Sequence, residues 1–318
     1  MTQHIFREYR SYLGSLILLF LLSMSSCKSS RIATEPQQNN DVLSNALLWE
    51  ISGQDLKQPS FLFGTMHLID TSSFFWPKNT ISSLERCDEV TFEVDMSIME
   101  DPAKQMSILS KATMKGNKTL ADFLSTEEYA LVDAHFKKMG LPLFFLDRIK
   151  PMFLTVFAAG NKDNVSYELK LLELAKQNNK TISGLETMEY QLSIFDSIPY
   201  EDQARSLYEA IQKESGTDDQ MQLMIQSYKD QNIVALYEMI ESEMDESVGN
   251  ISLLLDGRNQ NWIPVMEKMM QKSAHFFAVG AGHLAGDKGV ISLLKKAGYR
   301  VTPKSNTKNP NDRSTTNP

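Results

Sequence analysis

The first part of the chain alternates apolar and polar residues in the way that β-strands do. Two short runs, Leu47–Ile51 and Ser60–Phe63, flank a turn around Gly53, and this arrangement predicts a β-hairpin. A short helix is expected at about Asn79–Cys87, followed by a further apolar strand at Glu89–Val94. The sequence therefore opens its folded part with strands that can share one sheet.

The spacing of apolar residues becomes helical from Asp101 to about Gln271. Two helix starts in this region, Ser125–Glu128 and Thr217–Gln220, have capping-box spacing, in which two side chains satisfy unpaired backbone N–H groups. A strand is indicated inside the region only at Thr181–Ser183. The middle of the chain is therefore predicted to be a helical layer.

Strand spacing returns at the end of the folded part. A strand at His275–Val279, a helix at Gly286–Ala297 and a strand at Tyr299–Thr302 form a βαβ unit, with Gly298 at the helix end, where a positive φ costs little. Together these patterns predict a mixed α/β (α+β) fold with a central mixed sheet, in which strands at both ends flank the helical layer.

The N-terminus reads as an export signal. Arg7 and Arg10 precede an uncharged apolar stretch, Ser11–Ser26, which is shorter than the roughly 18–20 residues that span a bilayer. Small residues stand directly before Cys27, which resembles the lipoprotein box of bacteria, where the cysteine becomes the lipidated first residue of the mature protein. An ordinary signal peptide with an incidental cysteine is the alternative.

Polar segments without apolar periodicity bound the folded part. We expect a signal peptide at residues 1–26, a lipidated Cys27 with a flexible tether through residue 44, a folded domain at 45–304 and a disordered tail at 305–318. The expected location is the bacterial cell envelope, with the protein anchored by lipid to the outer or the cytoplasmic membrane and facing the periplasm or the cell surface.

Composition narrows the range of partners. Of 318 residues, 42% are apolar, which is enough for a sizeable core, and 40 acidic against 32 basic side chains give a net charge of −8 without a dense basic run. Nucleic acid is therefore not an expected partner, because phosphate binding depends on clustered positive charge. Besides Cys27 the chain has one cysteine, Cys87, which we expect to be a small buried apolar residue.

The candidate chemistry begins with a repeated tetrad, Gly-x-x-His. It occurs at Gly64–His67 and at Gly280–His283, each directly after an apolar strand. Glycine permits a sharp turn off the strand, so we expect each turn to aim its histidine into the crevice at the sheet edge. Two imidazoles that meet there, His67 and His283, could hold a divalent metal ion such as zinc.

An open metal site of this kind also needs a carboxylate. Glu93, at the end of an apolar strand, is the best candidate, since an unpaired charge there would be costly, and Asp95 is its competitor. Glu93 could instead pair with a basic neighbour such as Arg86. His135 and His275 lack the turn glycine and are expected to be surface or core residues.

These residues resemble the TraB/GumN family, which includes the Tiki proteases. The likeness covers about Ala46 to Pro303 and rests on these segments, in this order: Phe63–Leu68, Phe92–Asp95, Gly184–Thr187 with Gln191, Arg258–Asn259, and Val279–Leu284 followed by Gly289–Val290 and Leu293–Leu294. The resemblance implies a mixed α/β core with a helical insertion. It also implies a site made of His67, His283, Glu93 and Arg258, and metal-dependent peptide-bond cleavage with manganese or cobalt favoured.

The expected function is therefore that of a metal-dependent hydrolase with a peptide or protein substrate. Glu93 would complete the ligand set or act as the base, Arg258 would stabilise the oxyanion with Asn259 as an auxiliary donor, and the role of Glu186 stays open. A non-catalytic protein that binds a peptide, haem or a metal ion is the alternative, and an ester hydrolase is a third possibility. The sequence leaves the oligomeric state open.

Overall fold

The computed structural model describes residues 43–158, 163–213, 219–243 and 252–304. The predicted signal peptide, Cys27, nearly all of the tether, the capping box expected at residue 217 and the C-terminal tail lie outside the described residues. None of the helices within the described ranges is long and apolar enough to cross a membrane.

A six-stranded sheet with the order β6-β4-β7-β2-β1-β8 forms the centre of the fold. Neighbours pair in parallel from β6 to β2, while β1 runs antiparallel to both β2 and β8. The strands are β1 (Leu48–Ser52), β2 (Ser60–Thr65), β4 (Glu89–Val94), β6 (Thr181–Glu186), β7 (His275–Gly280) and β8 (Arg300–Pro303), and a second small sheet pairs β3 (Ile69–Asp70) with β5 (Asn164–Val165). Because four strands are parallel, their carboxyl ends share one edge, as the prediction required.

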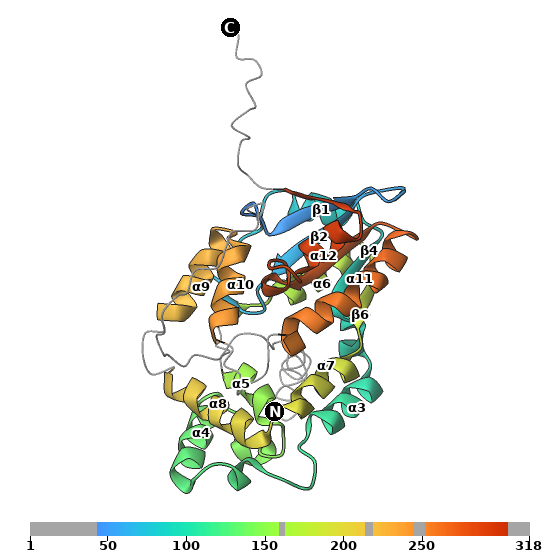
Figure 1. Ribbon diagram of the computed structural model, residues 1–318. Helices are drawn as coiled ribbons and strands as arrows, with labels where there is room; N and C mark the ends of the chain where they lie inside the picture. The colour runs from blue at the N-terminus through green and yellow to red at the C-terminus, as the bar shows by residue number, and fades with distance from the viewer. Residues whose placement is uncertain (1–42, 159–162, 214–218, 244–251, 305–318) are drawn as a thin grey trace.

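Helices occupy most of the chain between β4 and β7. In Figure 1 the sheet lies in the upper part of the molecule, α3, α4, α5, α7 and α8 lie below it, and α9 and α10 stand to one side. The helices are α2 (Thr80–Glu85), α3 (Pro102–Ala112), α4 (Thr126–Lys138), α5 (Pro151–Ala158), α6 (Tyr167–Gln177), α7 (Met188–Ile194), α8 (Tyr200–Lys213), α9 (Asp219–Lys229), α10 (Ile233–Glu243), α11 (Gly257–Met270) and α12 (Val290–Lys296). The mixed α/β fold with a large helical insertion is confirmed.

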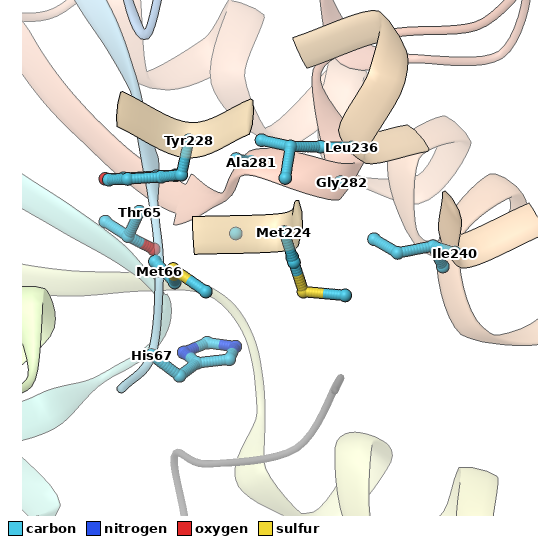
Figure 2. Close-up of a pocket in the computed structure, with 10 residues that line it drawn as sticks. Thr65, Met66, His67, Met224, Tyr228, Leu236, Ile240, Ala281 and Gly282 are labelled. Atoms are coloured by element: carbon cyan, nitrogen blue, oxygen red, sulfur yellow. The ribbon is translucent and has the colours of Figure 1, made fainter. Parts of the chain in front are cut away.

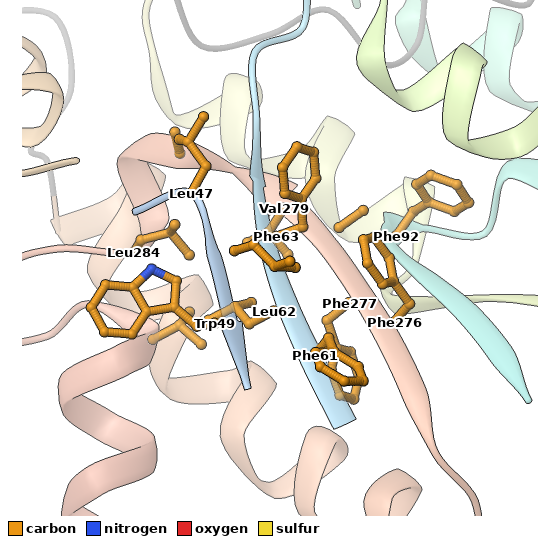
Figure 3. Close-up of a cluster of buried hydrophobic side chains, with 14 of the residues drawn as sticks. Leu47, Trp49, Phe61, Leu62, Phe63, Phe92, Phe276, Phe277, Val279 and Leu284 are labelled. Atoms are coloured by element: carbon orange, nitrogen blue, oxygen red, sulfur yellow. The ribbon is translucent and has the colours of Figure 1, made fainter. Parts of the chain in front are cut away.

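Two apolar clusters stabilise these parts. The larger one fills the space around the sheet, where side chains of β1, β2, β4 and β7 meet (Figure 3), and Phe63 of β2 lies against Tyr167 of α6. The second cluster joins helices of the insertion and includes Phe136, Leu154 and Leu207, all fully buried. The sheet edge that carries the predicted site therefore lies where the two clusters meet, because Phe92 belongs to the larger cluster and Val94 to the second.

Several elements confirm the sequence predictions. The hairpin β1–β2 and the strands β4 and β7 are present, and the capping box at Ser125 and Glu128 starts α4. The strand predicted at Thr181–Ser183 continues to Glu186, and Gly298 has a φ of 92° at the end of α12. Helix α12 is shorter at its start than predicted.

The neighbour of the final strand in the sheet was left open by the sequence. The predicted βαβ unit is present as β7, α12 and β8, but β8 pairs with β1 and not with β7. Two strands, β2 and β1, separate them in the sheet. The crossover therefore spans the hairpin, which the local sequence pattern does not encode.

Candidate active site at the carboxyl edge of the sheet

Three predicted residues meet around Gly280, the last residue of β7. A methyl group added to Gly280 would lie 3.4 Å from Oε1 of Glu93, 3.6 Å from Cδ2 of His283 and 3.8 Å from Nε2 of His67. These side chains come from the end of β4, the turn after β7 and the turn after β2. The parallel strand ends thus bring together residues that are far apart in the sequence.

The tetrad glycines are needed because a side chain at these positions would meet its neighbours, and not because the backbone has an unusual conformation. This corrects the expectation that they permit a sharp turn off the strand. Neither Gly64 nor Gly280 is among the residues with a positive φ. A Cβ on Gly64 would lie 2.6 Å from Cδ1 of Leu284 and 3.2 Å from Cα of Ala281. Gly64 therefore permits close packing of the two turns, and Gly280 keeps the space among Glu93, His67 and His283 open.

His67 is oriented by a buried carboxylate. Its Nδ1 lies 2.8 Å from Oε1 of Glu168, the same oxygen that accepts a hydrogen bond of 2.6 Å from the hydroxyl of Thr65. Ser166 donates to the other oxygen of Glu168 at 2.9 Å. Burial by itself would lower the pKa of His67, but the charge and hydrogen bonding of Glu168 outweigh it, so the pKa is raised above its usual value.

His283 is oriented by an amide and is kept neutral. Its Nδ1 lies 2.6 Å from Oδ1 of Asn259, whose amide nitrogen donates to the carbonyl of Lys288, and its ring lies against Trp262 with the centroids 4.5 Å apart. Burial lowers the pKa of His283 to about 3. With its proton on Nδ1, the neutral ring presents the lone pair of Nε2 to the site.

Glu93 is buried and ionised. The backbone N–H of Gly280 donates to its Oε1 at 2.8 Å, and Arg258 donates to its Oε2 at 2.6 Å. Burial would raise the pKa of Glu93, but the charge of Arg258 together with the Gly280 hydrogen bond holds it well below the usual range. Its rival Asp95 caps the following turn by accepting from the N–H of Ser97, and Glu93 does not pair with Arg86.

Arg258 lies at the centre of this network and is 2% exposed. It donates to Glu186 through Nε and Nη2, to Glu93 through Nη2, and through Nη1 to the carbonyl of Leu254 and towards Nε2 of His283 at 3.2 Å. These contacts use all five N–H groups of the guanidinium. Arg258 therefore balances two buried carboxylates and also occupies the lone pair of His283.

Glu186 is the second carboxylate in contact with Arg258. Its oxygens accept from Arg258 at 2.6 Å and from the indole N–H of Trp262 at 2.9 Å. Burial raises its pKa, and the charge of Arg258 opposes this. The question that the sequence left open is thus answered in part, because Glu186 holds Arg258 and Trp262 of α11 against the end of β6.

The donor types at this site fit a divalent cation. Two imidazoles and one carboxylate are a ligand set for first-row divalent metals. Among the described residues, however, no group of three or more His, Cys, Asp and Glu side chains stands in position to hold a metal ion. Arg258 engages both Glu93 and His283, so cation binding requires Nη1 of Arg258 to leave Nε2 of His283.

Sequence reasoning missed Glu168, Trp262 and the positioning role of Asn259. Glu168 follows Ser166 at the start of α6, where an acidic residue is usual and gives no sign of a site. Trp262 lies four residues after Arg258 on α11, so the helical period places both on one face, and this spacing could have found it. Of the other candidates, His275 is buried against Thr91, and burial raises the pKa of Cys87 to about 12.

Comparisons with known proteins identify the family of the chain. The model of the TraB/PrgY/gumN family matches residues 47–303. The metalloprotease TIKI1 of Danio rerio is 22% identical over 81% of the chain, the human metalloprotease TIKI1 is 22% identical over 84%, and the metalloprotease TIKI2 of Danio rerio is 18% identical over 86%. The chain spans 63% of the length of each of these relatives.

No solved structure matches the chain. The family match, in contrast, covers almost the whole described body, including both tetrads, Glu93 and Arg258. The resemblance that the motifs indicated is confirmed, and the chain belongs to the TraB/PrgY/gumN family.

Proposed function

We propose that this protein is a metal-dependent hydrolase that cleaves peptide bonds. The observation that carries the proposal is the convergence of His67, His283 and Glu93 within 4 Å of one point at Gly280. Curated relatives named metalloproteases support the reaction class. His67, His283 and Glu93 are the residues that would hold the cation, with manganese or cobalt favoured by the family and zinc permitted by the ligand types.

A divalent cation at this site would polarise the substrate carbonyl and make hydroxide available near neutral pH. In the reaction, hydroxide adds to the carbonyl carbon, the C–N bond breaks and the leaving nitrogen takes up a proton. One water molecule is consumed, and a carboxylic acid and an amine are released. The chain must orient the carbonyl, balance the charge that develops on its oxygen and supply the proton.

The electrostatics of the site favour particular roles for its residues. Because its pKa is held well below the usual range, Glu93 is a weak proton acceptor and is better suited to holding a cation than to acting as the base. The lone pair on Nε2 of His283 cannot both accept from Arg258 and bind a cation. When the cation binds, Nη1 of Arg258 therefore leaves Nε2 and can donate to the oxyanion. Asn259 fixes the tautomer of His283 in this scheme.

Metal content and cleavage, measured on the same samples, test the proposal. The protein is incubated with Mn²⁺, Co²⁺ or Zn²⁺, desalted, analysed for metal, and mixed with a library of unstructured peptides. We expect bound metal and peptide cleavage in the parent protein and in His135→Ala, a control on α4, and loss of both in His67→Ala and His283→Ala. Metal binding without cleavage would support the non-catalytic alternative, and cleavage of model esters alone would support an ester hydrolase.

We further propose that the protein is exported and anchored to a membrane of the bacterial cell envelope by lipid on Cys27. The pattern of Arg7, Arg10, the apolar stretch 11–26 and the cysteine supports this proposal. A lipid anchor would restrict the folded body to peptides or proteins at the membrane surface.

A further inference from the structure

A hollow opens beside the proposed metal site, between the sheet edge and the helices α9 and α10. Its enclosed volume is about 30 Å³, and all the empty space out to the solvent amounts to about 380 Å³. Figure 2 shows Met66 and His67 on the strand side and Met224 and Ile240 on the helical side. Leu236 of α10 and Ala281 complete the apolar part of the wall.

Two polar side chains in the wall have partners outside the hollow, and His67 stands where the hollow meets the proposed metal site. The hydroxyl of Thr65 donates to Glu168 at 2.6 Å, and that of Tyr228 donates to the carbonyl of Gly64 at 2.9 Å. A polar group that entered the hollow would therefore give up water without gaining these hydrogen bonds. The hollow is suited to hydrocarbon.

The hollow is continuous with the proposed site. His67 and Gly280 line it, and the same two residues stand with Glu93 and His283 where the strand ends converge. If the substrate carbonyl lies at that point, the side chain of the neighbouring substrate residue can therefore reach the hollow.

Close packing fixes the helical wall. A methyl group on Gly282 would lie only 2.4 Å from Cδ1 of Ile240, so glycine at this position lets α10 approach the turn after β7. The two methionines, Met66 and Met224, are unbranched and can adjust to side chains of different shape. The wall therefore has a fixed position and an adaptable lining.

We propose that this hollow is a specificity subsite that receives an apolar side chain, such as that of Leu, Met or Phe, from the substrate residue next to the cleaved bond. The inference rests on the proposed peptidase function for the identity of its occupant. The recognition itself, apolar against charged, follows from the wall and can be measured without any cleavage.

The binding test uses the metal-free protein with ¹³C-labelled methionine methyl groups, assigned by Met→Leu substitutions. The probes are N-acetyl-phenylalanine amide and N-acetyl-aspartate amide. We expect the phenylalanine probe to shift the Met66 and Met224 signals saturably, the aspartate probe to leave them unchanged, and Met106, which is 66% exposed, to respond to neither. Equal responses to both probes, or no response at Met66 and Met224, overturn the subsite.

The cleavage test maps the bonds that the metal-loaded protein cuts in a peptide library. We expect apolar residues at one position beside the cut, and Ile240→Asp to lower kcat/KM for such peptides by about 10–200-fold. Leu223→Asp is the matched control, because Leu223 is exposed on α9 and does not line the hollow. Cleavage without a preference for apolar residues would contradict the proposed subsite, but it would still support the proposed hydrolase function.

The two tests separate the two proposals. Methionine shifts without any cleavage retain the subsite and contradict the peptidase. If Ile240→Asp does not fold, as judged by circular dichroism, Ile240→Ala takes its place, and it is expected to favour larger side chains because it widens the hollow.

Discussion

The two histidines of the site are oriented by groups of different charge. Nδ1 of His67 faces the carboxylate of Glu168, whereas Nδ1 of His283 faces the amide oxygen of Asn259. The carboxylate raises the pKa of the first ring, while burial leaves the second ring neutral. Each partner nevertheless has the same geometric effect, because it fixes Nδ1 and leaves Nε2 for the site.

Replacement of Glu168 should therefore affect His67 in a measurable way. In Glu168→Gln the charge that raises the pKa of His67 is removed and the lowering effect of burial remains, so the pKa should fall. NMR titration of the imidazole in metal-free protein measures this change. We also expect metal affinity to fall by about 10–100-fold, as is typical when the partner of a metal-binding histidine is lost.

A matched control for Glu168→Gln is Glu173→Gln. Glu173 lies on the same helix, but its side chain is 56% exposed and pairs with Lys170. This variant should leave the pKa of His67 and the metal affinity unchanged. An unchanged pKa of His67 in Glu168→Gln would show that Glu168 does not act on the ring.

The tetrad glycines should respond differently to the same change. In Gly280→Ala the new methyl group makes only ordinary contacts, so the free energy of unfolding should change by less than about 1 kcal/mol while metal binding is lost, because the methyl fills the space among the ligands. In Gly64→Ala the methyl overlaps Leu284, which should destabilise the protein by about 1–3 kcal/mol. Chemical denaturation and metal titration measure the two effects. Retained metal affinity in Gly280→Ala would contradict the proposed site.

The residues of the site were predictable from the sequence to different degrees. His67 and His283 stand in the turns after apolar strands and Glu93 stands at the end of one, so periodicity and spacing were enough to single them out. Glu168 lies about a hundred positions after His67 at a helix start, and only the folding of α6 against the sheet brings the two together. Such partners depend on tertiary structure and leave no local signal.

At the scale of elements, one helix secures the ends of two strands. Arg258 of α11 joins Glu93 at the end of β4 to Glu186 at the end of β6, and Trp262 adds a hydrogen bond to Glu186. The buried guanidinium makes two adjacent carboxylates tolerable, since either one alone would carry a large desolvation cost. The position of α11 thus depends on charge as well as on apolar packing.

Arg258→Met should break this link and change the pH dependence of stability. Two buried carboxylates without a counter-charge should cost about 3–5 kcal/mol at neutral pH. Burial then raises the pKa values of Glu93 and Glu186 above those of the unfolded chain, so the stability of the variant is retained at low pH and is lost as pH rises. Urea denaturation at pH 5 and pH 8 should show a smaller deficit, relative to the parent protein, at pH 5.

A second substitution checks the cause of that deficit. Adding Glu186→Gln to Arg258→Met removes one of the two unpaired charges and should restore part of the stability at pH 8. An additive loss from the two changes would mean that the carboxylates do not repel each other. In that case lost packing, and not charge, would explain the effect of Arg258→Met.

The elements themselves were easier to predict than their neighbours in the sheet. The hairpin, β4 and β7 have local apolar patterns, and each is present. The pairing of β8 with β1 is a contact between the two ends of the domain, and nothing in either strand specifies its partner. The short polar strand Thr181–Ser183 was predicted, but its continuation to Glu186 depends on pairing with β4.

At the scale of the whole molecule, the proposed chemistry and the proposed recognition come from different parts of the chain. The proposed ligands stand at the ends of β2, β4 and β7, while α9 and α10 of the helical insertion form the outer wall of the subsite. Changes in α9 and α10 can therefore alter which side chain is accepted without touching the ligands. The division fits a scaffold on which one reaction is directed to different substrates.

The proposed lipid anchor would determine where this activity takes place, and it predicts a simple fractionation result. The chain has two cysteines, and burial raises the pKa of Cys87 to about 12, so Cys87 is not available for modification in the folded protein. In a bacterial host, labelled palmitate should therefore enter the parent protein and Cys87→Ala but not Cys27→Ser. The parent protein should sediment with membranes, and Cys27→Ser should move to the soluble fraction, because acyl chains provide the membrane affinity. Sedimentation of Cys27→Ser with membranes at the level of the parent would mean that the folded body reaches the membrane by another route, and the lipid anchor would no longer explain its location.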